Sequence, residues 1–191
     1  MVVQHMSRLP AFDVTALSAQ QRKVYDTIMS GPRRSVDGPF RAWLLSPDFA
    51  ERAQSLGLIC RFGSSLTPRL SELAILIVAA HWRSEFEWAG HSQLALAAGL
   101  SEAAIDALRR KVEPKFKEAD EAAVYRFARE LLENQTVSAT VFESAAEHFG
   151  LEGIVELIGI LGYYTLIAMT LAAFEIPAPP GTAPAFPEVR A

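Results

Sequence analysis

Cysteine is nearly absent from this sequence, because Cys60 is the only one among 191 residues. A single thiol cannot form an intramolecular disulfide, and one chain cannot build a thiolate metal centre from it. Disulfide scaffolds and zinc-thiolate domains are therefore excluded as fold classes. Sparse cysteine is typical of reducing compartments, so we expect a cytoplasmic protein.

Basic charge is also scarce. Lys and Arg number 18 against 22 Asp and Glu, which gives a net charge of −4. The two local basic spots, Arg33–Arg34 and 109–111, are so short that we expect solvated helix ends and turns. Without a basic stripe, nucleic acid is not an expected partner. Residues 1–13 lack the apolar core of a signal peptide, so export is not expected either.

No segment alternates apolar and polar residues with period two over enough length to build a sheet, so the fold class is predicted to be all-α. Ser or Thr caps, prolines at first helical positions and closing glycines mark the helix ends. They predict helices over 18–30, part of 33–43, 47–62, 68–82, 85–98, 102–110, 116–134, 138–149 and 151–174.

The helices are predicted to form one all-α domain over residues 1–176. Within it, residues 1–66 form an N-terminal helical extension. Residues 177–191 are rich in Pro and Ala. Such a composition favours an extended chain, so we expect a loosely held C-terminal tail.

One long apolar run raises the question of a membrane span. Residues 157–174 form an uncharged stretch of 18, at the lower edge of what crosses a bilayer. Glu152, Glu156 and Glu175 flank the run, and no Lys/Arg cluster orients it. A helix buried in the core or in a subunit interface is therefore predicted rather than a membrane span.

Acid/base side chains gather on the helix predicted over 85–98. Residues three, four and seven apart share a helix face, so one stripe carries Ser84, Glu87, Trp88, His91 and Ala95. Glu87 and His91 are one turn apart. They form either a surface ion pair or a pair of acid/base groups that faces a cavity.

Glu72 is the second unusual residue, because almost every residue from 70 to 80 around it is apolar. A helix that is apolar on nearly all sides is buried. A carboxylate in it must be capped by free backbone N–H groups, paired or used in function. We expect Arg69 to be its partner, whether Glu72 is structural or functional.

These residues carry a resemblance to a known family. The segment LSELAILIVAAHWRSEFEWAGHSQLALAAGLSEAAIDAL contains a Glu-Leu apolar helix, then Glu-Trp-x-x-His, then Ala-Gly-Leu-Ser. This order resembles the core of the carboxymuconolactone decarboxylase family, and the likeness covers residues 67–176 as the family core. RLPAFD, YDTIMSGPR and LLSPDFAERAQSLG resemble longer bacterial members. The resemblance implies a helical bundle of the alkyl hydroperoxidase D-like type.

Alkyl hydroperoxidase D enzymes of the same superfamily use a Glu, a Cys-x-x-Cys pair and a His. Alignment on His91 puts Ser84 and Glu87 where the cysteines would be, and Glu72 where the glutamate would be. Dithiol peroxide chemistry needs a peroxidatic and a resolving thiol, and Cys60 lies outside the motif. A thiol peroxidase mechanism is therefore not expected.

The resemblance implies decarboxylation of a small lactone. Loss of CO2 from a carboxymuconolactone leaves a dienolate, which then takes a proton at another carbon. Glu72, Glu87 and His91 become the candidate catalytic residues. A protonated glutamate would deliver the proton, and a protonated His91 would stabilise the oxyanion. Burial beside Trp88 would favour neutral Glu87, while a charged His91 would oppose this.

Three more residues are candidates for substrate binding: Trp88, which would form a pocket wall, Ser84, and Arg83, which either binds a carboxylate or is solvated at a helix junction. The chemistry needs no metal or organic cofactor. Di-iron bundles use Glu-x-x-His twice, whereas this sequence has one Glu-x-x-x-His, so no metal site is expected.

Two other functions stay open. One is a peroxidase-related protein of the superfamily, and the other is a non-catalytic oligomer in which Glu87 and His91 bridge subunits around a small ligand. Family members assemble into trimers or hexamers through apolar helices. The resemblance therefore implies a homotrimer or homohexamer, in which residues 157–174 would be buried.

Overall fold

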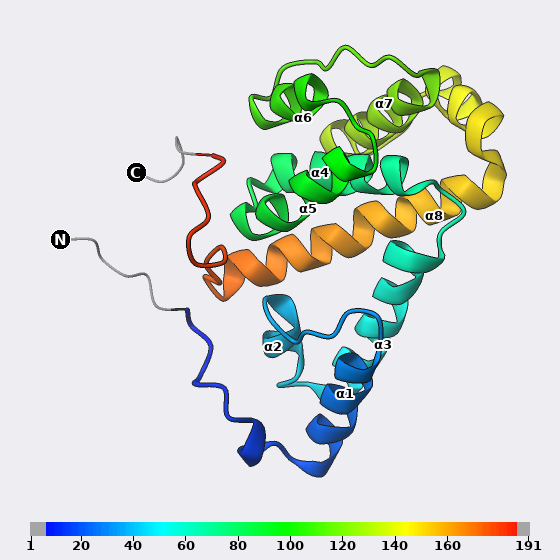
Figure 1. Ribbon diagram of the computed structural model, residues 1–191. Helices are drawn as coiled ribbons and strands as arrows, with labels where there is room; N and C mark the ends of the chain where they lie inside the picture. Colours follow the sequence, from blue (N-terminus) through cyan, green and yellow to red (C-terminus); the bar gives the residue numbers. More distant parts are fainter. Residues whose placement is uncertain (1–6, 187–191) are drawn as a thin grey trace.

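The computed structural model describes residues 7–186, and no strand occurs in that range, so the chain is all-α as predicted. Figure 1 shows the helices in chain order. Their bounds are η1 Val14–Ala16, α1 Ala19–Ser30, α2 Pro39–Trp43, α3 Pro47–Leu58, η2 Ile59–Gly63, α4 Pro68–Trp82, α5 Glu85–Ala97, α6 Glu102–Arg109, α7 Ala119–Asn134 and α8 Ala139–Ala173.

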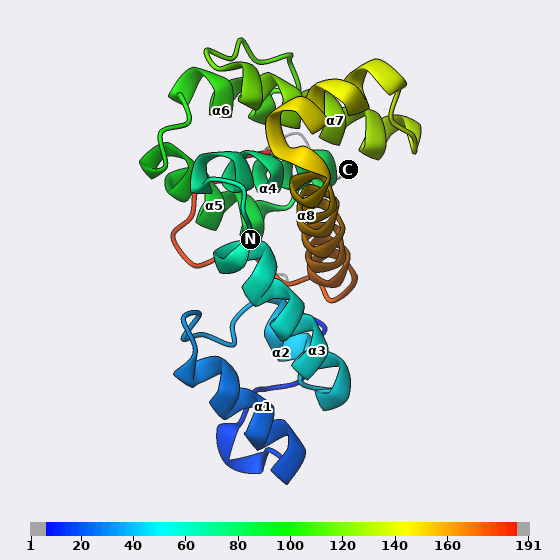
Figure 2. The ribbon, with the colours of Figure 1, turned by 90° about the vertical axis from the view of Figure 1, so that its right-hand side faces the viewer.

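The long helix α8 is the axis on which the other helices pack. Helices α4 and α7 lie against it, and α5 and α6 in turn cover α4. Helices α1 to α3 form a separate layer on the other side of α8, as both views show (Figures 1 and 2). Helix α8 is therefore covered on one side by the N-terminal extension and on the other by the remaining helices.

Several polar contacts join the N-terminal extension to α8. Trp43 Nε1 donates to Thr170 Oγ1 at 3.0 Å. The Glu156 carboxylate accepts from the backbone N–H of Ser65 at 2.7 Å, just before α4 begins. Glu156, which flanks the apolar run, thus holds the connection between the two layers.

Local cap signals place most helix ends where the sequence predicts them. The Ser18 side chain accepts from Gln21 N in a capping box, and the Ser101 side chain accepts from Ala104 N. Helix α7 differs, because it begins at Ala119 rather than at residue 116. Phe116 instead packs against Tyr125 at a ring distance of 5.4 Å, which turns the preceding segment back over the helix.

Helix α8 contains the break that the sequence predicts at Gly150. Its backbone there has φ 65° and ψ 178°, a conformation that only glycine adopts at low cost. Helical segments lie on both sides of this residue, which matches the two helices predicted over 138–149 and 151–174.

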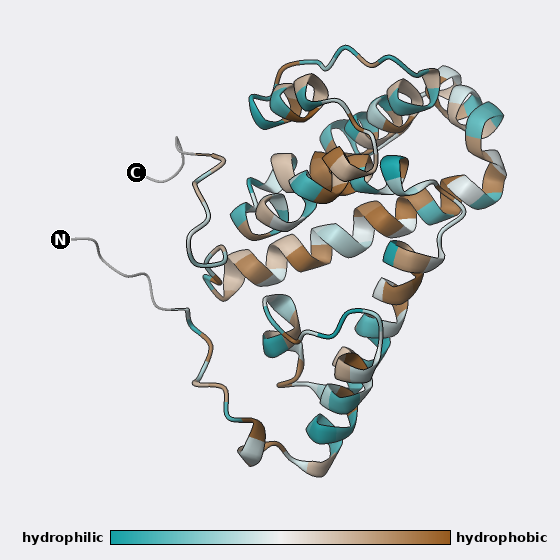
Figure 3. Cartoon of the chain, viewed as in Figure 1, coloured by the Kyte–Doolittle hydropathy of each residue, from teal (hydrophilic) through white to brown (hydrophobic). Residues whose placement is uncertain are grey.

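The apolar side chains of α4 and α8 make up much of the core, and both helices show apolar patches in Figure 3. In α4 every residue from Leu70 to Ala80 is buried. Helix α8 is long and apolar enough to cross a membrane, and 56% of its most apolar 18-residue window is buried inside the protein.

The remaining face of α8 is an exposed apolar stripe. Its large side chains are Leu151, Val155, Ile158 and Met169, which are 46–68% exposed. Contiguous apolar surface of this kind is typical of sites that contact another macromolecule. The homotrimer or homohexamer expected from the family resemblance would bury it, and that assembly stays a prediction.

The C-terminal tail does not match its predicted looseness. The backbone N–H groups of Ala185 and Phe186 each donate to the Glu85 carboxylate at 2.8 Å. The Phe186 ring is 5% exposed and meets Trp88 edge to face at 5.1 Å. The expectation is therefore wrong for Ala185 and Phe186, while residues 187–191 lie outside the described part of the chain.

Candidate functional site

Three of the predicted site residues meet in the interior. Glu72 comes from α4, and Glu87 and His91 come from successive turns of α5. Their exposed fractions are 9%, 6% and 6%. Ionisable side chains are rarely buried to this extent unless they are paired or functional.

Glu72 pairs with His91. Glu72 Oε2 lies 2.7 Å from His91 Nδ1, a distance at which a carboxylate accepts a hydrogen bond from the ring N–H. This contact fixes the orientation of the imidazole and leaves Nε2 to face the other way.

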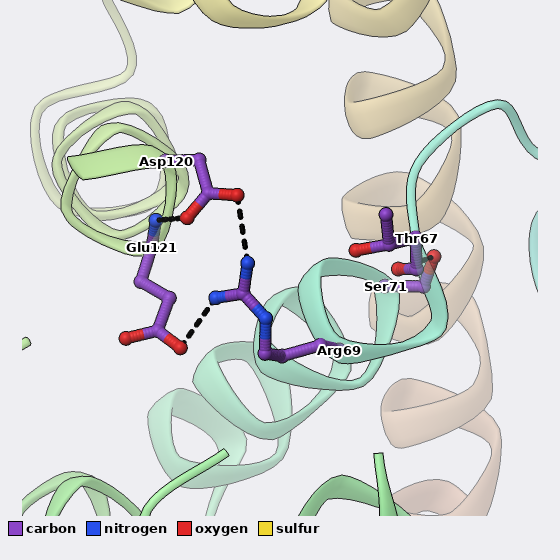
Figure 4. A network of polar contacts seen from close by, with 5 residues as sticks. All are labelled: Thr67, Arg69, Ser71, Asp120 and Glu121. Carbon is purple, nitrogen blue, oxygen red and sulfur yellow. Dashed lines mark hydrogen bonds and ion pairs between the residues drawn. The ribbon is translucent and has the colours of Figure 1, made fainter. Parts of the chain in front are cut away.

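The prediction that Arg69 pairs with Glu72 is wrong. Arg69 Nη2 donates to Asp120 at 2.8 Å and Nη1 donates to Glu121, both at the start of α7 (Figure 4). The two Nη groups of Arg69 are thus each bonded to a different carboxylate of α7, which leaves Glu72 free to pair elsewhere. Arg69 therefore joins α4 to α7 and is not part of the acid/base site.

Glu87 is the least satisfied group of the site. Its Oε2 lies 3.7 Å from His91 Nε2, beyond hydrogen-bond distance, and has no hydrogen-bond partner among the described residues. A surface ion pair, one of the two interpretations of this spacing, is contradicted, because both side chains are buried. Burial raises the pKa of the Glu87 carboxyl, although the nearby charges of His91, Arg61 and Arg33 oppose the rise.

Two tyrosines of α8, which sequence reasoning missed, complete the wall around these groups. The Tyr164 ring meets the His91 ring edge to face at 5.1 Å, and the Tyr163 ring lies 5.6 Å from that of Tyr164. Burial raises the pKa of both phenols, which therefore stay neutral. The signal was present as two adjacent hydroxyls inside the apolar run 157–174.

Tyr163 Oη is buried and has no hydrogen-bond partner among the described residues. It lies over Gly57 of α3, where an added Cβ would come within 2.1 Å of the hydroxyl oxygen. Glycine at this position is thus what lets the hydroxyl pack so close to the backbone of the N-terminal extension.

Arg33 also belongs to this region, which corrects the prediction that Arg33 and Arg34 are both solvated. Arg34 is exposed, as expected. Arg33 instead turns inward and stacks on the Phe40 ring, with Cζ 4.4 Å from the ring centroid. Its sequence context, a turn between two helices, gave no signal of burial.

The three predicted substrate-binding residues lie near the start of α5. Ser84 precedes the helix, and its Oγ is buried without a partner. Trp88 and Arg83 both face the tail, since the Arg83 guanidinium lies 5.7 Å from the Phe186 ring that packs on Trp88. Trp88 packs on the tail, and the pocket-wall role expected for it stays a prediction.

A cavity of about 340 Å³ lies elsewhere, between α4, the segment before α7, and α7. Its polar lining includes His81, Lys111, Glu113, Arg129 and Glu133, and none of the three buried acid/base residues borders it. None of the unpartnered buried polar atoms belongs to a residue that lines this cavity, whereas Glu87 Oε2 is one of them. The Glu72, Glu87 and His91 cluster therefore stays the candidate site.

Thiol chemistry has little support in this structure. Cys60 is buried, and burial raises the pKa of its thiol, which disfavours the reactive thiolate. Among residues 7–186, no group of three or more His, Cys, Asp or Glu side chains is arranged to hold a metal ion.

Comparison with known proteins gives one match to a family model. The model described as "CMD: Carboxymuconolactone decarboxylase family" matches residues 47–130, from the start of α3 into α7. The matched range includes Glu72, Glu87 and His91, whereas Arg33, Tyr163 and Tyr164 lie outside it. No curated protein matches the chain.

Proposed function

Because residues 47–130 match the model of the carboxymuconolactone decarboxylase family, we propose that the protein decarboxylates a small lactone or keto acid without a cofactor. The observation that carries the proposal is the buried Glu87 carboxyl. It has no partner for Oε2, and burial favours its protonated form. A buried carboxylic acid that stays neutral can donate its proton to a carbanion.

The reaction on γ-carboxymuconolactone has two steps. The bond between the ring carbon and the departing carboxylate breaks, CO2 leaves, and the electron pair is delocalised into the lactone carbonyl as a dienolate. A proton then adds to a ring carbon next to that carbonyl. Glu87 supplies this proton and recovers one from solvent after product release.

His91 has the complementary role of holding the dienolate oxygen. The Glu72 carboxylate, at 2.7 Å from Nδ1, stabilises positive charge on the imidazole. An Nε2–H that points away from Glu72 would then donate to the oxygen on which negative charge develops. Glu72 acts as a positioning residue, since it works through His91.

Turnover of γ-carboxymuconolactone tests the proposal. We expect CO2 release by the wild-type protein and a decrease in kcat by about 10²–10⁴-fold in Glu87→Gln, because glutamine cannot donate the proton. Glu102→Gln is the matched control, since Glu102 is exposed in the first turn of α6. It should keep wild-type turnover.

Circular dichroism of each variant shows whether the helices are intact. If folded wild-type protein released no CO2 from this lactone, decarboxylation of it would be excluded. If Glu87→Gln retained wild-type kcat, the proton would come from another group and the assigned role would be wrong.

A further inference from the structure

Arg33 is a half-buried cation that forms no ion pair with another described residue. It lies in the turn between α1 and α2, and its Nη2 is shielded from solvent with no hydrogen-bond partner among the described residues. Burial lowers the pKa of the guanidinium, yet an arginine remains charged at any physiological pH. A charge kept in such a place is costly unless an anion comes to it.

Aromatic contacts connect Arg33 with the acid/base site. The Phe40 ring on which Arg33 stacks packs on Trp43 at 5.1 Å, and Trp43 packs on Tyr163 at 6.0 Å. Tyr163, Tyr164 and Glu87 are among the groups that act electrostatically on the guanidinium. The N-terminal extension therefore places a cation beside the aromatic side chains that border the site.

The Tyr163 hydroxyl is the second unpartnered donor in this place. Tyr163 packs edge to face on Trp43 of α2 at 6.0 Å and lies over Gly57 of α3. The N-terminal extension thus contacts both donors: it carries Arg33 and packs around Tyr163. A planar guanidinium and a phenolic hydroxyl are both donors that suit a carboxylate.

We propose that Arg33 and the Tyr163 hydroxyl form a binding subsite for the carboxylate that the substrate retains. This inference rests on the proposed function, in which the substrate carries two carboxylates. The carboxylate that departs as CO2 is lost more easily from a poorly solvated place without a cation, because a cation would stabilise the carboxylate before the bond breaks. The retained carboxylate keeps its charge throughout, so Arg33 can hold it and orient the ring toward Glu87 and His91.

A binding experiment separates this subsite from the reaction. The probe is furan-2-acetate, a planar ring with one carboxylate and no group to lose as activated CO2, and its uncharged partner is the corresponding amide. Isothermal titration calorimetry gives the Kd of each for the wild type, Arg33→Gln, Arg33→Lys and Arg34→Gln. Arg34 is the matched control, because it is the adjacent arginine and is exposed.

We expect Arg33→Gln to weaken furan-2-acetate binding by at least about tenfold, since a charge-assisted pair is lost. Arg33→Lys should lie between the two, because it keeps the charge without the two-pronged geometry. Arg34→Gln should bind as the wild type does, and the amide should lose little in any variant. If Arg33→Gln failed to fold, the folded Arg33→Lys variant would give the same comparison with a smaller loss.

Equal Kd values for Arg33→Lys or Arg33→Gln and the wild type would overturn the subsite, as would a wild type that does not bind the probe saturably. Turnover is read separately. A protein that binds the probe through Arg33 but releases no CO2 from the lactone keeps the subsite and loses the decarboxylase function. A protein that decarboxylates with no dependence on Arg33 keeps the function and loses the subsite.

Discussion

Replacing Glu72 by glutamine is expected to lower kcat of the proposed decarboxylation by roughly 10²–10⁴-fold, the range seen when the group that orients a catalytic histidine is neutralised. Glu72 Oε2 holds His91 Nδ1 at 2.7 Å. Glutamine can fill the same space, but it has no negative charge to stabilise an imidazolium. Because Glu72 does not touch the substrate in this account, KM should change little.

A double substitution tests whether Glu72 acts only by positioning His91 or contributes to catalysis independently of it. If Glu72 acts only through His91, adding Glu72→Gln to His91→Ala should cause no further loss of kcat, since residues that act as a unit are not additive. Steady-state kinetics on the wild type, both single variants and the double variant give the comparison. Losses that multiply would show that Glu72 acts independently, and an unchanged kcat in Glu72→Gln would remove it from the mechanism.

Replacing Arg69 by methionine should destabilise the fold by about 2–4 kcal/mol, because it leaves the buried Glu121 carboxylate without its counter-ion. Arg69 bonds to Asp120 and Glu121, and the Glu121 side chain is only 7% exposed (Figure 4). The pairs tie the first turns of α4 to the start of α7. Urea unfolding at one fixed protein concentration measures the loss in free energy of unfolding.

A second substitution and a surface control sharpen the Arg69 result. Glu121→Gln in the Arg69→Met background should recover much of the lost stability, since no uncompensated charge then remains at that position. Arg129→Met breaks a pair with Glu133 whose side chains are 47% and 50% exposed, and should cost at most about 1 kcal/mol. Equal losses in Arg69→Met and Arg129→Met would show that burial of the network contributes nothing.

Much of the fold could be predicted because its signals are local. A capping serine at position 18 and a proline after Thr67 act on the backbone within one turn, so the ends of α1 and α4 follow from neighbouring residues. The break at Gly150 is local in the same sense. The start of α7 depends instead on Phe116 packing against a helix that follows it, which a local pattern does not contain.

The candidate site likewise has one part that local sequence signals predict and another part that depends on how the helices pack. Glu87 and His91 share a face of one helix by spacing alone, so their proximity was predictable. The pairing of Glu72 with His91 depends on how α4 packs on α5, which the sequence does not show. Arg69 lies closer to Glu72 in the sequence and was therefore the expected partner. Tyr163 lies inside an apolar run whose hydropathy indicates burial but no function. Arg33 lies in a polar turn, and such turns are usually exposed to solvent.

The tail shows how a disorder-like composition can still dock. Pro and Ala favour an extended chain, and the described tail has no helix or strand, only a turn in which Thr182 N donates to Pro179 O. A single aromatic residue, Phe186, supplies the apolar area that fixes it against Trp88, and the Glu85 carboxylate binds its backbone. The average composition of the tail does not reveal that one residue, Phe186, anchors it.

The central claim is that Glu87 is kept protonated by burial so that it can donate a proton. Its charged neighbours are His91, Arg61, Arg33 and Glu72, and burial outweighs the three cationic ones. An NMR titration of protein labelled at glutamate ¹³Cδ, with the Glu87 signal identified by its loss in Glu87→Gln, measures this pKa directly. The account predicts a midpoint above the ordinary value of 4.5, so that Glu87 stays protonated at a pH where exposed glutamates have ionised. A midpoint at or below 4.5 would contradict it, because Glu87 would then be a carboxylate with no proton to give.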